Sequence, residues 1–232
     1  MDSPFFLLMS LFKTSILWFN SSMSSFEIRI CENPVCGLRY PLIKGHPFGE
    51  RCPLCLGSTI TTLTREISVE PPAALQQPQL KLEALLDNVR SAWNVGAIFR
   101  TSDGFGVQKI YLCGITPTPE NPSVRKTALG ADSSIPWVHS RNALLMAQKI
   151  KAEGAHLWAL EQDERAIPVH SNFKVDDQPI VLIVGNEISG VDPAMLDLCE
   201  RIVYIPMLGK KRSLNVEVAF GAAMSTLRNN PT

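Results

Sequence analysis

The chain has 232 residues, which is enough for one ordinary domain and a small additional one. Hydrophobic residues make up 45% and charged residues 19%, so the chain can bury a full core and is not an intrinsically disordered protein. Lys plus Arg and Asp plus Glu both number 22, which gives zero formal net charge. This balance excludes a uniformly basic nucleic-acid-binding protein, so any bound nucleic acid must be held by local positive charge.

The first 25 residues differ from the rest of the chain. Residues 4–19 are apolar and aromatic but contain Lys13, and Asp2 stands where a signal peptide carries basic residues. No uncharged apolar run reaches the roughly 18 residues that cross a bilayer, which argues against a polytopic membrane protein. Residues 1–25 are therefore predicted to be a disordered extension, or a mis-called start with the true start near Met23. A membrane-associating tail and a signal peptide are the alternatives, and the cytoplasm is the expected location.

Four cysteines form two close pairs at the start of the globular sequence. They are Cys31, Cys36, Cys52 and Cys55. Two such pairs separated by a loop can place four thiolates tetrahedrally around one zinc ion. A short segment with so few large apolar residues needs a cross-link of this kind to fold. Residues 26–60 are therefore predicted to be a small zinc-ribbon-like domain, with His46 as a substitute ligand and disulfides or unligated thiols as the alternatives.

A linker and a larger domain follow this segment. Residues 61–79 are polar and proline-rich without periodicity, which is typical of a semi-extended linker. Residues 80–229 then alternate short apolar runs with helix-like stretches. The predicted strands are Lys81–Asp87, Lys109–Cys113, His156–Leu160, Ile180–Val184 and Arg201–Ile205. The predicted helices are Val95–Phe105, Ser123–Leu129, Ala143–Lys151, Pro193–Cys199 and Leu214–Leu227. This alternation predicts an α/β domain with a parallel sheet and helices on both faces.

Three loops of this domain carry polar residues, and in parallel sheets ligands bind beyond the carboxyl ends of the strands. The loop at residues 88–101 holds Asn94, which suits the N-cap of the following helix, and Arg100, a charge that needs a partner on a packed helix. Residues 185–190 have neither a Walker A nor a G-x-G-x-x-G pattern. This absence counts against nucleoside triphosphates and dinucleotides as ligands. The third loop covers residues 205–216, and Ser213 is expected at the start of the last helix.

The motifs of these loops stand in a fixed order along the chain. They are Asn94-x-Gly96-Ala97-Ile98-x-Arg100-Thr101, Val184-Gly185-Asn186-Glu187-x-x-Gly190, Ile205-Pro206-Met207 and Ser213-Leu214-Asn215-Val216, with Lys126–Ala131 after the first. Together they resemble the motifs of the SpoU/TrmH branch of the SPOUT RNA methyltransferases, over residues 80–228. The resemblance implies a C-terminal trefoil knot, S-adenosylmethionine as methyl donor, a homodimer, and methylation of a ribose 2′-hydroxyl in tRNA or rRNA. The cysteine-rich segment departs from the commonest members, so the particular RNA stays open.

The resemblance also implies the roles of individual residues. Arg100 would be the catalytic residue, as a base or, because a guanidinium gives up its proton so reluctantly, as an electrostatic stabiliser of the ribose alkoxide. Glu187 would orient Arg100 or the Asn94 amide, while Ser213 and Asn215 would position the substrate and the neighbouring loops. The cofactor-binding residues implied are Leu160, Gly185, Asn186, Gly190, Ile205, Met207 and Leu214.

RNA is expected to be held by local clusters of basic residues. These are Arg125 and Lys126, and the triplet Lys210, Lys211 and Arg212, although the triplet by itself is typical of a solvated loop. The small residues within 214–227 are the candidate for close helix packing near a dimer axis. A catalytically inactive RNA-binding module of the same fold is the alternative function. A dinucleotide-dependent oxidoreductase is a weaker one, because the glycine fingerprint is missing.

Overall fold

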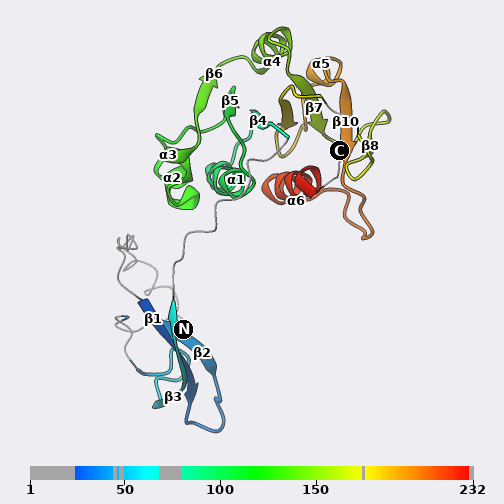
Figure 1. Cartoon of the computed structure of the whole chain (residues 1–232). Coiled ribbons are helices and arrows are strands. Elements are labelled where there is room, and N and C mark those ends of the chain that lie inside the picture. Colours follow the sequence, from blue (N-terminus) through cyan, green and yellow to red (C-terminus); the bar gives the residue numbers. More distant parts are fainter. Residues whose placement is uncertain (1–23, 44–45, 47–49, 68–79, 174–175, 230–232) are drawn as a thin grey trace, which may run out of the picture. The chain divides into compact units, whose positions relative to one another are not determined.

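The computed structural model describes residues 24–43, 46, 50–67, 80–173 and 176–229 (Figure 1). The chain divides into two compact units, Met1–Leu75 and Gln76–Thr232. Residues 1–23 of the predicted extension and residues 68–79 of the predicted linker lie outside the described residues.

The smaller unit is a three-stranded antiparallel sheet in the order β2-β1-β3. Its strands are β1 (Ser24–Cys31), β2 (Arg39–Ile43) and β3 (Thr59–Ile67). The predicted boundaries were wrong at both ends of this unit, because β1 begins at Ser24 and β3 continues through residues 61–67. The sequence of β3 is rich in Thr and Ile, which favour strands, and it pairs with β1 along its whole length.

The larger unit contains a seven-stranded sheet in the order β6-β5-β4-β9-β7-β10-β8, and every pairing in it is parallel. Its strands are β4 (Leu82–Asp87), β5 (Ile110–Cys113), β6 (Trp137–Ser140), β7 (His156–Leu160), β8 (Ile167–Pro168), β9 (Ile180–Val184) and β10 (Arg201–Tyr204). The five predicted strands are all present. Two further strands, β6 and β8, were not predicted; they are short, lie at the two edges of the sheet and are incompletely buried.

Helices cover both faces of this sheet, as predicted (Figure 1). They are α1 (Ala92–Gly104), α2 (Pro122–Ala128), α3 (Ala131–Ser134), α4 (Ala143–Ala152), α5 (Pro193–Leu196) and α6 (Val216–Asn229). Alternate residues of β9 enter two separate cores. Ile180, Leu182 and Val184 pack with residues of α1 and α6, whereas Val181 and Ile183 pack with residues of α4 and α5. The strand order does not define how the chain threads, so the trefoil knot stays a prediction.

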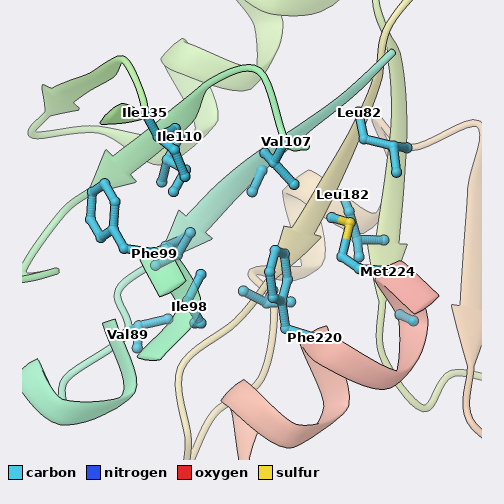
Figure 2. Packing of buried hydrophobic residues seen from close by; sticks show 14 of the residues in the cluster. Leu82, Val89, Ile98, Phe99, Val107, Ile110, Ile135, Leu182, Phe220 and Met224 are labelled. Atoms are coloured by element: carbon cyan, nitrogen blue, oxygen red, sulfur yellow. The ribbon is translucent and has the colours of Figure 1, made fainter. Parts of the chain in front are cut away.

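The first of these cores lies between the sheet and the helices α1 and α6. Figure 2 shows Phe99 and Ile98 of α1 with Phe220 and Met224 of α6 below the strands. All four side chains are fully buried. This packing fixes the two helices whose N-terminal ends border the candidate site. No helix among the described residues is long and apolar enough to cross a membrane.

The starts of these two helices differ from the prediction. Asn94 is not the N-cap of α1, because Ser91 takes that place and its Oγ accepts a hydrogen bond from the Asn94 backbone N–H at 3.3 Å. The last helix begins at Val216, so Ser213 lies before it. Asn215 Oδ1 accepts from the Glu217 N–H at 2.9 Å and so satisfies a free donor of the first turn of α6. Because Ser91 caps α1, the Asn94 side chain is available for another role.

Candidate active site and metal centre

A pocket of about 420 Å³ lies at the carboxyl ends of β7, β9 and β10. Its size is within the roughly 300–1,000 Å³ typical of small-molecule sites. All seven predicted cofactor-binding residues line it: Leu160, Gly185, Asn186, Gly190, Ile205, Met207 and Leu214. Glu187, Arg212, Ser213 and Asn215 line it as well. The structure therefore brings the second and third predicted loops together around one cavity.

Part of the pocket wall was not predicted from the sequence. The additional lining residues are Glu161, Gln162, Val184, Ile188, Tyr204, Val216 and Ala219. Glu161 and Gln162 directly follow β7, and Tyr204 ends β10. Their positions at strand ends were a usable signal, because ligands bind beyond the carboxyl ends of parallel strands.

The Glu161 carboxylate is held in the pocket wall by backbone donors. Its Oε2 accepts from the Val191 N–H at 3.0 Å, and its Oε1 accepts from the Gln162 N–H at 2.8 Å. Gly190 makes room for this carboxylate, since a Cβ at that position would lie 2.3 Å from Glu161 Oε2. Gly190 also has a φ of +72°, which disfavours other residues. The positive φ therefore favours glycine here, and any side chain at this position would displace the Glu161 carboxylate.

The turn at residues 185–190 is closed on itself and tied to the first loop. The backbones of Asn186 and Gly190 exchange two hydrogen bonds, at 3.0 and 2.9 Å. Asn186 Oδ1 accepts from the Ile188 N–H at 2.9 Å, and Asn186 Nδ2 donates to the Asn88 carbonyl at 2.7 Å. Asn186 therefore shapes the pocket through its own loop and anchors that loop to the end of β4.

The Asn94 side chain connects all three predicted loops. Its Nδ2 donates to Glu187 Oε1 at 3.1 Å, and its Oδ1 accepts from Asn215 Nδ2 at 3.1 Å. Glu187 also accepts from the backbone N–H groups of Arg90 at 2.9 Å and Ser91 at 3.0 Å. Glu187 was expected to orient Arg100 or the Asn94 amide, and its hydrogen bond is with the Asn94 amide.

The hydrogen bonds to Glu187 influence its ionisation. Partial desolvation raises the pKa of this carboxyl, but the donors from Arg90, Ser91 and Asn94 outweigh it and hold the pKa below its usual value. Glu187 is therefore ionised at neutral pH and remains an acceptor for all three donors.

Asp87, at the end of β4, differs because it is only 2% exposed. Burial raises its pKa, although donors from the Asp192 N–H and the Asn88 amide oppose the rise.

Arg100 lies apart from this network. It is on α1, its side chain is exposed, and it is not among the residues that line the pocket. The expectation that it has a partner within its own chain is not met among the described residues, where no hydrogen bond or ion pair involves its guanidinium. This guanidinium is therefore available to a molecule other than the described chain.

The predicted RNA-binding residues fall into two groups. Lys210, Lys211 and Arg212 are exposed in the loop before α6, and of the three only Arg212 lines the pocket. Arg125 and Lys126 are exposed on α2. Arg125 Nε donates to the Pro119 carbonyl at 2.6 Å, while Lys126 Nζ lies 5.5 Å from the centre of the Trp93 ring.

The four cysteines of the small unit converge on one point. Their sulfur atoms all lie within 4.8 Å of one another, with Cys31 and Cys55 at 3.4 Å and Cys36 and Cys52 at 3.7 Å. Four sulfurs at about 2.3 Å from a central zinc would be roughly 3.8 Å apart in a tetrahedron. None of the four cysteines is in a disulfide, and His46 is not a member of the group. The donor set therefore fits a tetrahedral zinc ion.

The parallel sheet with a polar-rimmed pocket beyond its strands defines the larger unit as an α/β domain built to bind a small molecule. The sequence model described as the SpoU rRNA Methylase family matches residues 81–225. The chain belongs to this family, which confirms the resemblance seen in its motifs.

Similar proteins and structures agree with this assignment. The chain is 30% identical over 190 residues to the 23S rRNA (guanosine(2553)-2′-O)-methyltransferase RlmP of Bacillus subtilis, covering 78% of this chain and 73% of that protein. It is 32% identical over 152 residues to the tRNA (guanosine(18)-2′-O)-methyltransferase of Aquifex aeolicus, covering 63% and 68%. The crystal structure of the A. aeolicus TrmH/SpoU tRNA modifying enzyme has a TM-score of 0.58 and 26% identity, and the match covers 67% of this chain and 76% of that one.

A further solved structure shares the fold. The SpoU methyltransferase AviRb from Streptomyces viridochromogenes, in complex with the cofactor AdoMet, has a TM-score of 0.57 and 23% identity. The match covers 75% of this chain and 68% of that one.

Proposed function

We propose that this protein transfers a methyl group from S-adenosylmethionine to a ribose 2′-hydroxyl of rRNA or tRNA. The observation that carries the proposal is the convergence of three polar loops, linked by Asn94, at the rim of a pocket that contains every predicted cofactor-binding residue. The names of the B. subtilis and A. aeolicus relatives specify this reaction on 23S rRNA and on tRNA respectively. An RNA substrate and unpaired cysteines favour the reducing cytoplasm as the location.

The pocket suits S-adenosylmethionine. Aliphatic side chains of Leu160, Ile205 and Leu214 offer an apolar surface for the adenine, and the turn at residues 185–190 offers backbone groups to its edge. AviRb, which shares the fold, is described in complex with this cofactor. When bound, the cofactor supplies a methyl group on a positively charged sulfur. The Glu161 carboxylate in the pocket wall is an acceptor for a hydroxyl or an ammonium group of such a ligand.

The residues around the pocket have to align the ribose hydroxyl with this methyl group, because the transfer is an in-line displacement. Asn94, Glu187 and Asn215 hold the three loops in register, and Ser213 lines the pocket as a hydroxyl for the substrate. Arg100 stabilises the developing alkoxide and holds an adjacent phosphate, which a guanidinium does without losing its own proton. The proton of the 2′-hydroxyl leaves to water as the oxygen–methyl bond forms and the methyl–sulfur bond breaks.

Arg100 does not line the pocket of its own chain, but in a homodimer it would lie at the pocket of the other subunit. Arg100 is exposed on α1 outside the pocket. Beside α1, α6 exposes Val218 to 50%, and Leu214, in the loop before α6, is 39% exposed. Exposed apolar side chains near a functional residue are typical of a subunit interface. The small residues of α6 serve this interface only in part, because Ala223 is fully buried within its own unit.

The four cysteines of the small unit are proposed to hold one structural zinc ion. Cys31, Cys36, Cys52 and Cys55 would supply four thiolates, and a site with no open position has a structural rather than a catalytic role. A three-stranded sheet with few buried residues gains most of its stability from such an ion.

Loss of a specific modified nucleoside is the decisive test of the proposed activity. Mass spectrometry of RNA from cells with and without the gene should show one ribose-methylated nucleoside missing from the deletion strain. The purified protein should then restore it on that RNA, and only with S-adenosylmethionine present. If the protein binds RNA but no methylated nucleoside is lost, it is the inactive RNA-binding module instead.

A further inference from the structure

Trp93 is a large aromatic side chain that the fold leaves exposed at the start of α1. Its exposed fraction is 55%, although tryptophan is usually largely buried in proteins. It belongs neither to the described core clusters nor to the lining of the pocket. It directly precedes Asn94, whose amide links the loops of the candidate site. Packing of its own unit therefore does not explain this residue, whereas its position beside the site suggests a ligand.

One face of the Trp93 ring carries a positive charge. Lys126 Nζ of α2 lies 5.5 Å from the ring centre, in the geometry of a cation–π contact. The two helices approach closely at Gly96, where an added Cβ would lie 1.9 Å from Thr127 Oγ1. This close packing positions Lys126 beside the indole, while 55% of Trp93 remains exposed.

Trp93 and Arg100 lie on the same exposed strip of α1. Residues seven positions apart are two helical turns apart, so the two side chains project in nearly the same direction about 10 Å from each other along the axis. The strip is bordered by α2, through Gly96, and by α6, through the hydrogen bond from Thr101 Oγ1 to Glu217 Oε1 at 3.0 Å. An aromatic ring, an ammonium and an unpaired guanidinium are thus displayed together between two helices.

We infer that Trp93 stacks on an RNA base that flanks the methylated nucleotide, and that Lys126 contacts the phosphate next to this base. The inference rests on the proposed RNA methyltransferase function. Stacking on tryptophan is a common way for proteins to hold unpaired RNA bases, and it tolerates any base because every base has an aromatic face. A protein without net charge needs such a contact, because its overall field does not attract RNA. Trp93 is then an RNA-positioning residue, separate from the cofactor pocket.

The test compares two labelled RNA probes of about 12 nucleotides, an oligoadenylate and an abasic oligomer with the same phosphates, in fluorescence anisotropy. Trp93→Ala should weaken oligoadenylate binding by about 5- to 100-fold, as expected for the loss of one stacked base, and should leave abasic binding unchanged. Trp93→Phe should retain most of the affinity. Lys126→Gln should reduce the salt dependence by about one unit of slope and act on both probes equally. Leu145→Ala is the matched control, since Leu145 is 61% exposed on α4, across the sheet.

Two results would overturn the inference. The first is an unchanged affinity of Trp93→Ala for oligoadenylate. The second is a smaller species of this variant in light scattering, which would make Trp93 a contact between two copies of the chain. Calorimetric titration of the wild-type protein with S-adenosylmethionine, together with methyl incorporation into RNA from the deletion strain, tests the proposed function independently. Failure of those two measurements would count against the methyltransferase and not against the stacking site.

Discussion

Asn94 joins segments that are 93 and 121 residues away along the chain, at Glu187 and Asn215. The position requires a side chain that donates at one atom and accepts at another, and an amide does both. An aspartate would place a second carboxylate against Glu187, and a leucine would remove the hydrogen bonds to both Glu187 and Asn215. This chemical requirement explains an asparagine inside the first turn of α1, where the residue has only modest helix propensity.

Arg100 is the residue on which the proposed chemistry depends. Arg100→Ala should reduce methyl transfer by about 10²- to 10³-fold, the usual cost of removing one preorganised stabiliser of developing charge. The affinity for S-adenosylmethionine should change by only a few-fold, because Arg100 does not line the pocket. Arg100→Lys should restore little activity, since an ammonium lacks the planar fork of the guanidinium. Single-turnover rates and calorimetric titration measure the two effects separately.

Mixed dimers of the proposed homodimer would show which pocket Arg100 serves. Subunits with Arg100→Ala keep an intact pocket, whereas subunits with Gly190→Ala keep Arg100 but have a pocket wall displaced against Glu161. We expect the mixed dimer to recover part of the activity that each variant lacks alone, because Arg100 of one subunit would complete the pocket of the other. Absence of recovery, with mixed dimers confirmed by mass, would place Arg100 in the site of its own chain.

Glu187 is expected to contribute to the free energy of unfolding at neutral pH and to lose this contribution in acid. Its pKa is lower in the folded protein than the roughly 4.3 of an unfolded chain, so its stabilising contribution is fully present above that value. The contribution is lost as the pH falls through the lower, folded pKa. Urea unfolding of the wild type and of Glu187→Gln should therefore differ by a constant free energy from pH 7 to 5, and this difference should shrink as the pH falls below about 4.3 and through the folded pKa. A difference that does not change with pH would contradict this role for the ionised carboxylate.

At the scale of the elements, the four-cysteine cluster and the three-stranded sheet are expected to gain or lose stability together. Cys52→Ser should remove zinc and increase amide exchange over residues 24–43 and 50–67, because this sheet has few buried side chains to replace the ion. Residues 80–173 and 176–229 should keep their exchange protection, since their two cores contain no residue of the small unit. Cys199→Ser is the matched control and should retain the metal. Elemental analysis that finds no zinc in the wild type would refute the site.

The elements show which features a sequence can predict and which need the folded structure. The five central strands were predictable because both faces of each are covered, which leaves unbroken apolar runs such as Ile180–Val184. Edge strands lack this signature, so β6 and β8 were missed. The residues of the pocket came from motifs, whereas the Asn94 network and the distance of Arg100 from the pocket depend on contacts between distant segments. Glu161 was missed because a single acidic residue after a strand is a common surface feature.

For the molecule as a whole, zero net charge means that RNA affinity must come from a few places. Replacing Lys210, Lys211 and Arg212 by glutamine should weaken RNA binding and lower its salt dependence by up to about three units of slope. The affinity for S-adenosylmethionine should fall little, because Arg212 is the only one of the three in the pocket lining. Binding titrations over a series of salt concentrations provide the measurement. An unchanged slope would identify the triplet as a solvated turn.

The strand order also determines when the sheet can close. β9 lies between β4 and β7, although residues 88–179 separate it from β4 along the chain. At translation rates of about 5–20 residues per second, the ribosome needs roughly 5–20 s to make this segment. Throughout that time β4 has an open edge, which is the kind of edge that pairs with other chains. Co-translational binding of a chaperone to the emerging β4–β5 segment would therefore protect the nascent protein until its central strand arrives.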